Sequence, residues 1–291
     1  MSKPLDYISC TCSARDGLRL AVRKYGWHNK DPHPVLCLAG ITRNSSDFHD
    51  LAIYLASSAG GNRRIVTLDY RGRGASEYDK NPDNYTLAVE ADDVVDIITA
   101  LGLGEINIIG SSRGGLIAMM LASSRPGVLK SVILNDIGPV IDATGLVRIW
   151  RTYEGKNKPT TFKEAASLRE RHGKLASPAF SKDEWDKEAH RLYKSEKGKL
   201  ALQFDKKLLK SLRSINLDER LSDMWPDFGA LTKVPVLVIR AENSDILSKD
   251  TLEAMAALHP NMKTEIALGQ SHAPILSVGR LEKTISTFIK H

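Results

Sequence analysis

The stretch that decides the fold is Asn107-Ile108-Ile109-Gly110-Ser111-Ser112-Arg113-Gly114-Gly115-Leu116-Ile117-Ala118. It places the motif G-x-S-x-G between an apolar run typical of a buried strand and an apolar run typical of a helix. A turn this tight leaves room only for small residues two positions before and after the central serine, and Gly110 and Gly114 stand there. The motif therefore predicts a serine hydroxyl presented at a helix N-terminus, where backbone N–H groups stabilise negative charge.

The composition is that of a globular protein, because 42% of the 291 residues are hydrophobic and 26% are charged. The length suits one large α/β unit with an insertion. Three cysteines without regular spacing argue against a disulfide framework and against a metal site. The first residues carry no apolar run typical of a signal peptide, and no stretch approaches about 18 uninterrupted apolar residues. We therefore expect a cytoplasmic protein without a membrane partner.

Positive charge is concentrated in residues 151–213, which hold 17 Lys and Arg against 9 Asp and Glu. The whole chain has a formal net charge of +6, so the remainder is slightly acidic. A solvated helical face accounts for such a segment, and attraction of an anionic small-molecule substrate is the functional alternative. No nucleic-acid motif accompanies the charge and only 6% of residues are aromatic, so we expect no nucleic-acid partner.

Short buried strands alternate with amphipathic helices along most of the chain. A hairpin over 8–26 is followed by strands predicted at 35–38, 65–68, 106–109, 132–134, 234–239 and 264–268. Helices are predicted at 44–55, 87–101, 116–121, 251–258 and 276–289. This alternation indicates an α/β fold with a mostly parallel, doubly wound sheet and helices on both faces.

The alternation is interrupted between 139 and 228, where helical periodicity occurs without a convincing buried strand. Helices are predicted there around 148–150, 162–168, 185–193 and 200–212. We interpret 139–228 as a helical cap, or lid, inserted into a core domain formed by 1–138 and 229–291. Such an insertion is expected over the carboxyl edge of the sheet, where ligands of open α/β sheets bind.

A serine hydroxyl becomes a useful nucleophile only when a base takes its proton and a third group orients that base. His272 is the predicted base, because it lies in the exit loop of the strand at 264–268. Asp245, after the strand at 234–239, is our choice for the orienting acid. Glu242 is a rival three residues nearer that strand. Asp136, at the end of the strand at 132–134, is a second rival that we interpret as a turn or cap former.

The order Ser112, Asp245, His272 is the one in which these groups follow one another in hydrolases with a strand–serine–helix turn. The negative oxygen of a tetrahedral intermediate would need two preorganised donors. The backbone N–H groups of Arg113 and Ile41 are the predicted donors, since one follows the serine and the other lies in the glycine turn after the strand at 35–38.

The chain resembles the capped serine hydrolases of the α/β-hydrolase fold, esterases and lactonases among them. The matching segments are Leu38-Ala39-Gly40-Ile41, Asp69-Tyr70-Arg71-Gly72-Arg73-Gly74-Ala75-Ser76, the serine turn, Ser244-Asp245 and Gly269-Gln270-Ser271-His272-Ala273-Pro274. The resemblance implies Ser112 as nucleophile, Asp245 as acid, His272 as base, and the Ile41 and Arg113 amides as the oxyanion hole. Two departures stand out. Ala39 replaces the common histidine of the oxyanion loop, and Arg113 stands where Met or Gln often follows the serine.

Acyl transfer to water follows from these groups, so hydrolysis of a carboxylic ester, lactone or thioester is the leading hypothesis. Hydrolytic cleavage of a carbon–carbon bond in an anionic vinylogous diketo acid is an alternative, and a slow-turnover ligand sensor is another. We expect no cofactor and no metal. The glycines of Arg71-Gly72-Arg73-Gly74 lack the third glycine and the helix start of a dinucleotide-binding loop.

Overall fold

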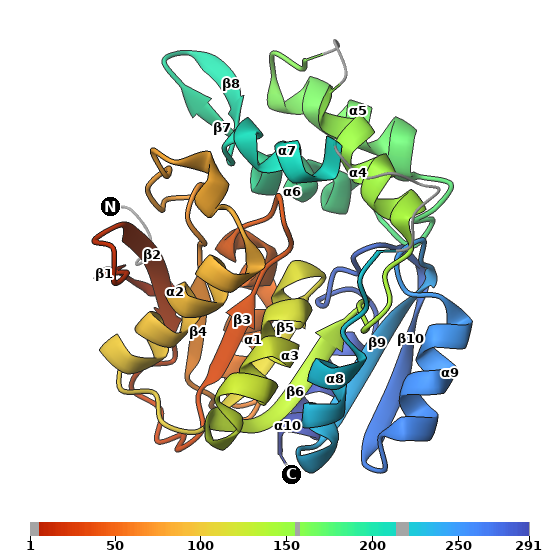
Figure 1. Ribbon diagram of the computed structural model, residues 1–291. Helices are drawn as coiled ribbons and strands as arrows, with labels where there is room; N and C mark the ends of the chain where they lie inside the picture. Colours follow the sequence, from red (N-terminus) through yellow and green to blue (C-terminus); the bar gives the residue numbers. More distant parts are fainter. Residues whose placement is uncertain (1–5, 155–157, 214–220, 291) are drawn as a thin grey trace.

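The computed structural model describes residues 6–154, 158–213 and 221–290. Within them, an eight-stranded sheet has the order β1-β2-β4-β3-β5-β6-β9-β10 (Figure 1). β2 runs antiparallel to both of its neighbours, and the six strands from β4 to β10 pair in parallel. The predicted mostly parallel sheet is confirmed. Its strands are β1 (Ile8–Ser13), β2 (Arg19–Tyr25), β3 (Val35–Leu38), β4 (Ile65–Leu68), β5 (Ile106–Ser111), β6 (Leu129–Asn135), β9 (Val236–Asn243) and β10 (Met262–Ser271).

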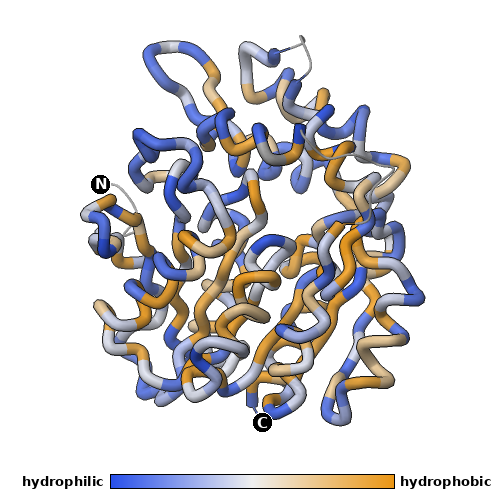
Figure 2. Tube along the Cα trace, viewed as in Figure 1, coloured by the Kyte–Doolittle hydropathy of each residue, from blue (hydrophilic) through white to orange (hydrophobic). Residues whose placement is uncertain are grey.

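Helices cover both faces of the sheet, as the alternating pattern predicts (Figure 1). One face packs against α1 (His49–Ala56) and α10 (Leu281–Ile289). The other packs against α2 (Leu87–Ala100), α3 (Arg113–Ser124), α8 (Trp225–Ala230) and α9 (Lys249–Leu258). Neighbouring residues of β5 therefore both reach an apolar core, Ile108 on the α3 side and Ile109 on the α1 side. This explains why the strands read as continuous apolar runs, which Figure 2 shows at the centre of the molecule.

The inserted segment forms a separate layer beyond the ends of the strands (Figure 1). It contains α4 (Ala143–Glu154), α5 (Phe162–Gly173), α6 (Lys182–Leu192) and the short α7 (Lys210–Arg213). The limits 139 and 228 of the cap stay a prediction. α8, at its end, packs against α3 of the core, where Phe228 is fully buried. Among the described residues, no helix has both the length and the apolar character needed to cross a bilayer.

One predicted helix is wrong. The segment 200–212 begins as β8 (Lys199–Leu202), which pairs antiparallel with β7 (Tyr193–Glu196), and continues as two short helical turns. Lys197 and Gly198 both have positive φ, as a two-residue type I′ hairpin turn requires. Strand pairing therefore overrides the helical spacing of the leucines, a tertiary effect that periodicity does not contain.

Hydrogen bonds join the inserted layer to the carboxyl ends of the strands. Ser177 Oγ lies 2.8 Å from Oγ of Ser271 at the end of β10. Asn243, the last residue of β9, donates from Nδ2 to the Ala176 carbonyl at 2.9 Å. The Gly74 amide donates to the Gln203 carbonyl at 2.7 Å. The layer therefore covers the edge at which the sequence predicts the site.

Substituting Gly114→Ala tests the close approach of α3 to β3. A Cβ at Gly114 would lie 2.1 Å from the Leu38 carbonyl oxygen, a backbone atom that cannot rotate away. We expect this clash to outweigh the better helix propensity of alanine and to lower the free energy of unfolding by about 1–3 kcal/mol. Gly127→Ala is the matched control, because nothing lies within 4 Å of a Cβ there. Equal urea midpoints for both variants would contradict the packing argument.

Candidate active site

Ser112 lies in the tight turn between β5 and α3, with the backbone angles φ 51° and ψ −115°. The two glycines of the motif allow this conformation, since a Cβ at Gly110 would lie 2.5 Å from the Gly114 carbonyl oxygen. The Ser112 amide donates to the Asn135 carbonyl at the end of β6, at 3.1 Å. The predicted turn is therefore present, and the residue is 9% exposed.

His272 follows β10 and reaches the serine. Its Nε2 lies 2.9 Å from Ser112 Oγ, and its Nδ1 lies 2.9 Å from Asp136 Oδ2. A carboxylate only accepts hydrogen bonds, so Nδ1 carries the proton and Nε2 is free to accept from the serine hydroxyl. The three side chains form the hydrogen-bonded series that nucleophilic catalysis requires.

Asp136 is fully buried one residue beyond β6, with a positive φ of 55°. Its Oδ1 accepts from the Ala241 amide at 2.8 Å, and its Oδ2 also accepts from Ser244 Oγ at 2.8 Å. Two donors besides His272 therefore hold the carboxylate in place against the histidine. Sequence reasoning missed Ser244 in this role.

The structure corrects the predicted partner of His272, because Asp136 and not Asp245 bonds to it. Asp245 instead pairs with Arg148 of α4, where Arg148 Nη2 lies 2.9 Å from Asp245 Oδ1. Burial alone would raise the pKa of Asp245, but the hydrogen bond and charge of Arg148 outweigh it and lower that pKa. Our interpretation of Asp136 as a turn former omitted its contact with the histidine.

Glu242 is also directed elsewhere. Its Oε2 accepts from the Gly269 amide at 2.7 Å, which bridges β9 and β10 at an exposed position. β6 and β9 are adjacent and parallel, with Asn135 opposite Ile239, so residues following both strands come near the same histidine. Sequence order alone could not separate these carboxylates.

The backbone N–H groups of Ile41 and Arg113, the predicted oxyanion donors, belong to segments on either side of Ser112. Arg113 is the first residue of α3, so its N–H has no acceptor inside the helix. A Cβ at Gly40 would lie 3.7 Å from Ser112 Cβ, which places the loop after β3 directly beside the serine. Within the described chain, no acceptor takes a hydrogen bond from the Ile41 or Arg113 amide. Both can therefore donate to a developing oxyanion.

A cavity of about 880 Å³ lies between the inserted layer and the sheet, and Ser112 and His272 line it. Five arginines and three carboxylates line it as well: Arg43, Arg148, Arg151, Arg169, Arg191, Asp47, Glu188 and Asp245. Arg151 of α4 is exposed, and its side chain makes no hydrogen bond or ion pair with any described residue. The cavity is thus positively charged and retains an unpaired guanidinium that can bind an anion.

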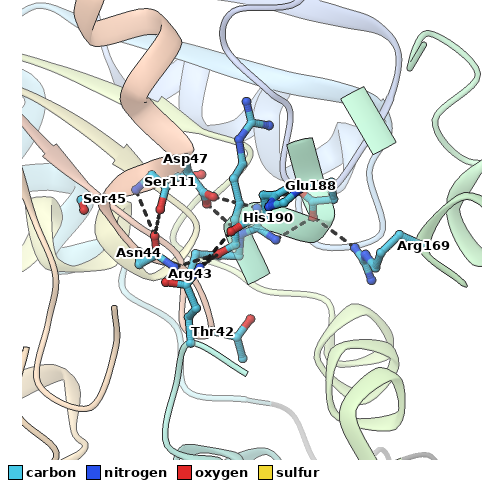
Figure 3. A network of polar contacts seen from close by, with 12 residues as sticks. Thr42, Arg43, Asn44, Ser45, Asp47, Ser111, Arg169, Glu188 and His190 are labelled. Atoms are coloured by element: carbon cyan, nitrogen blue, oxygen red, sulfur yellow. Dashed lines mark hydrogen bonds and ion pairs between the residues drawn. The ribbon is translucent and has the colours of Figure 1, made fainter. Parts of the chain in front are cut away.

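Figure 3 shows an ion-pair network that joins the loop after β3 to α6. Arg43 lies between Asp47, at 2.7 Å, and Glu188 of α6, at 2.6 Å. Arg169 of α5 approaches the same Glu188 carboxylate at 3.4 Å. Burial would raise the pKa of Glu188, but the Arg43 charge and hydrogen bonds outweigh it and lower the pKa to about 2.

Comparisons of the sequence give one family and two informative relatives. A family model described as the alpha/beta hydrolase fold matches residues 33–277. The 3-hydroxybutyrate-oligomer hydrolase of Cupriavidus necator is 27% identical over 284 residues, covering 94% of this chain and 93% of the relative. The 2-(acetamidomethylene)succinate hydrolase of Mesorhizobium japonicum is 26% identical, over 82% of this chain and 81% of the relative.

Solved structures agree with this result. An alpha/beta hydrolase from Novosphingobium aromaticivorans superimposes with a TM-score of 0.90 and is 33% identical, covering 99% of each chain. A putative hydrolase from Rickettsia typhi has the same fold, with a TM-score of 0.84 at 24% identity and 99% coverage of each chain.

Substituting Glu188→Gln is expected to lower the free energy of unfolding at neutral pH by about 1–3 kcal/mol. This is less than the loss expected when a buried cation has no remaining partner, because Arg43 still pairs with Asp47. The Glu188 pKa falls from an ordinary 4.5 to about 2 on folding, so its charge stabilises the fold above pH 4.5. This contribution is lost as the pH falls from 4.5 through about 2. Urea unfolding of the unmodified protein and of Glu188→Gln at pH 7 and pH 3 should therefore show a smaller difference in free energy of unfolding at pH 3.

The matched control is Glu170→Gln, since the one ion pair that the Glu170 side chain makes with a described residue is the exposed pair with Lys174 at 3.3 Å. We expect Glu170→Gln to change the free energy of unfolding by less than about 1 kcal/mol at either pH. A Glu188→Gln effect of the same size at both pH values would contradict an ionic origin.

Proposed function

This chain belongs to the α/β-hydrolase family of hydrolases, and we propose that it cleaves a carboxylic ester, lactone or thioester of an anionic substrate through an acyl-enzyme on Ser112. The observation that carries the proposal is the series Ser112–His272–Asp136, with 2.9 Å at each link, of which Ser112 and His272 line the cavity.

The proposed mechanism has two steps. Ser112 Oγ attacks the carbonyl carbon while His272 Nε2 takes the hydroxyl proton, and that proton passes to the departing alcohol or thiol. Asp136 holds the histidine tautomer and stabilises the imidazolium that forms. A water molecule, deprotonated by His272, then attacks the acyl-enzyme carbonyl; the bond from that carbon to Ser112 Oγ breaks, the proton returns from His272 Nε2 to Oγ, and the carboxylic acid is released. The Ile41 and Arg113 amides bind the oxyanion in both steps.

Anionic substrates are supported by the charge of the cavity and by the chemistry of the relatives' substrates. A 3-hydroxybutyrate oligomer is an ester with a terminal carboxylate, and 2-(acetamidomethylene)succinate carries two carboxylates. Among the described lining arginines, Arg151 supplies a guanidinium whose side chain has no partner. The ester is favoured over a carbon–carbon bond because 94% of the chain aligns with the oligomer hydrolase.

Ser112→Ala is expected to lower kcat for p-nitrophenyl butyrate by about three orders of magnitude or more, because the nucleophile is removed. A fluorophosphonate should label the unmodified protein at Ser112, as peptide mapping will show. Many turnovers per labelled serine would exclude a slow ligand sensor. Undiminished turnover in the alanine variant would refute the serine mechanism.

Asp136→Asn is expected to lower kcat by about three to four orders of magnitude, because the histidine loses the acceptor that sets its tautomer. Asp245→Asn is the matched variant, and we expect kcat to stay within about tenfold since Asp245 bonds to Arg148 and not to His272. Steady-state kinetics with the same ester measure both. A severe loss of kcat in Asp245→Asn and a mild loss in Asp136→Asn would instead identify Asp245, in the loop after β9, as the orienting acid.

Arg151→Gln is expected to raise KM for p-nitrophenyl hydrogen succinate about three- to tenfold, and to leave KM for neutral p-nitrophenyl butyrate unchanged. Added salt should raise KM for the anionic ester in the unmodified protein. Arg171→Gln is the control, because Arg171 is an exposed arginine of α5 outside the cavity lining. Equal effects on the anionic and neutral esters would contradict an anion site.

A further inference from the structure

A buried carboxylate lies behind the oxyanion hole. Glu90, on α2, has no exposed surface, and it binds two arginines at once. Its Oε1 lies 2.6 Å from Arg73 Nη1, and its Oε2 accepts from Arg113 Nε. The Arg73 side chain is likewise fully buried, whereas that of Arg113 is 12% exposed. The pairing therefore belongs to the interior of the protein and not to its surface.

Each of these two arginines is connected to one of the proposed oxyanion donors, the backbone amides of Ile41 and Arg113. Arg73 Nε donates to the Ile41 carbonyl at 2.9 Å, which anchors the residue whose amide is one of the two proposed donors. Arg113 supplies the other amide from its own backbone, while its side chain is tied to Glu90. One carboxylate thus connects the loop after β3 with the first turn of α3.

We propose that Glu90 is a positioning residue that, through Arg73 and Arg113, holds the two backbone donors at the spacing an oxyanion requires. The inference rests on the proposed function of Ser112. Donors stabilise the developing charge only when they are fixed before the reaction, because reorganising them would raise the barrier. The Ile41 loop lies beyond the end of β3 and lacks strand pairing, so its position depends on contacts such as the one from Arg73.

The cluster is a poor device for stability alone. Moving one carboxylate and two guanidinium groups out of water is costly, and apolar replacements of buried ion pairs are often as stable. Among the described residues, Arg73 Nη2 and the buried Tyr70 hydroxyl have no hydrogen-bond partner, which adds to that cost. Ala39 replaces the histidine that is common in the oxyanion loop of similar hydrolases. Arg73 supports this loop from another part of the chain, through its bond to the Ile41 carbonyl.

The test compares Glu90→Gln and Arg73→Lys with the matched control Arg71→Lys. Arg71 is 1% exposed in the same loop and pairs with Asp93 and Asp79, and its side chain reaches neither Ile41 nor Arg113. All three variants disturb a buried ion pair, so general destabilisation is shared. Urea unfolding establishes that each variant is folded under the assay conditions.

We expect Glu90→Gln and Arg73→Lys to lower kcat for p-nitrophenyl butyrate about 10- to 100-fold, with KM changed less than about threefold. The affinity for phenylboronic acid, whose tetrahedral adduct on Ser112 places an oxygen in the hole, should fall by the same factor as kcat. The pH at which activity is half-maximal should stay in place, since His272 and Asp136 are untouched. Arg71→Lys should retain kcat and boronate affinity.

The outcomes separate this inference from the proposed function. If Ser112→Ala abolishes turnover but folded Glu90→Gln keeps kcat and boronate affinity, Glu90 has no positioning role and the serine mechanism stands. If Ser112→Ala retains turnover, the proposed function itself fails. Arg113→Gln keeps the backbone amide but removes the ion pair with Glu90, at a side chain that is partly exposed. If either buried variant does not fold, kcat and boronate affinity of Arg113→Gln test the positioning role instead, and unchanged values would contradict it.

Discussion

The left-handed backbone of Ser112 is the constraint on which the site depends. Its φ of 51° is possible only because Gly110 and Gly114 let β5 and α3 meet without side chains between them. The same closeness brings α3 against the Leu38 carbonyl of β3, so the loop after β3 lies beside the serine. This packing of one helix against two strands therefore brings Ser112, the proposed nucleophile, next to the loop that carries the Ile41 amide.

Parallel strand order explains the rest of the site. β6, β9 and β10 are neighbours that end at the same edge, so the residues that follow them converge. Two carboxylates, Asp136 and Asp245, reach this edge from adjacent strands. Asp136 meets His272 because the Ala241 amide and Ser244 hydroxyl also hold it there, whereas Asp245 is drawn to a cation of the inserted layer.

Part of the positive charge of the inserted layer attaches that layer to the slightly acidic core. Arg148 pairs with Asp245, and Arg191 and Lys187 both pair with Asp50 of α1. The sequence-based choice between a solvated face and an anion-attracting face was therefore incomplete, since some of these cations have partners in the core. Among the described cavity-lining arginines, Arg151 has no side-chain partner, and it is the one that we propose for an anionic substrate.

The sequence by itself determined which segments along the chain are buried strands and which are amphipathic helices. It also determined the serine turn and the histidine after the last strand, because each of these features follows from local spacing and residue size. It also placed Ile41 and Arg113 next to their strands. It could not choose between Asp136 and Asp245 or detect the β7–β8 hairpin, because both depend on partners far along the chain. The link from Glu90 to the oxyanion loop is of the same kind. Only the tertiary structure decided these points, since hydrogen bonds and buried charges between distant residues select one of several locally equivalent arrangements.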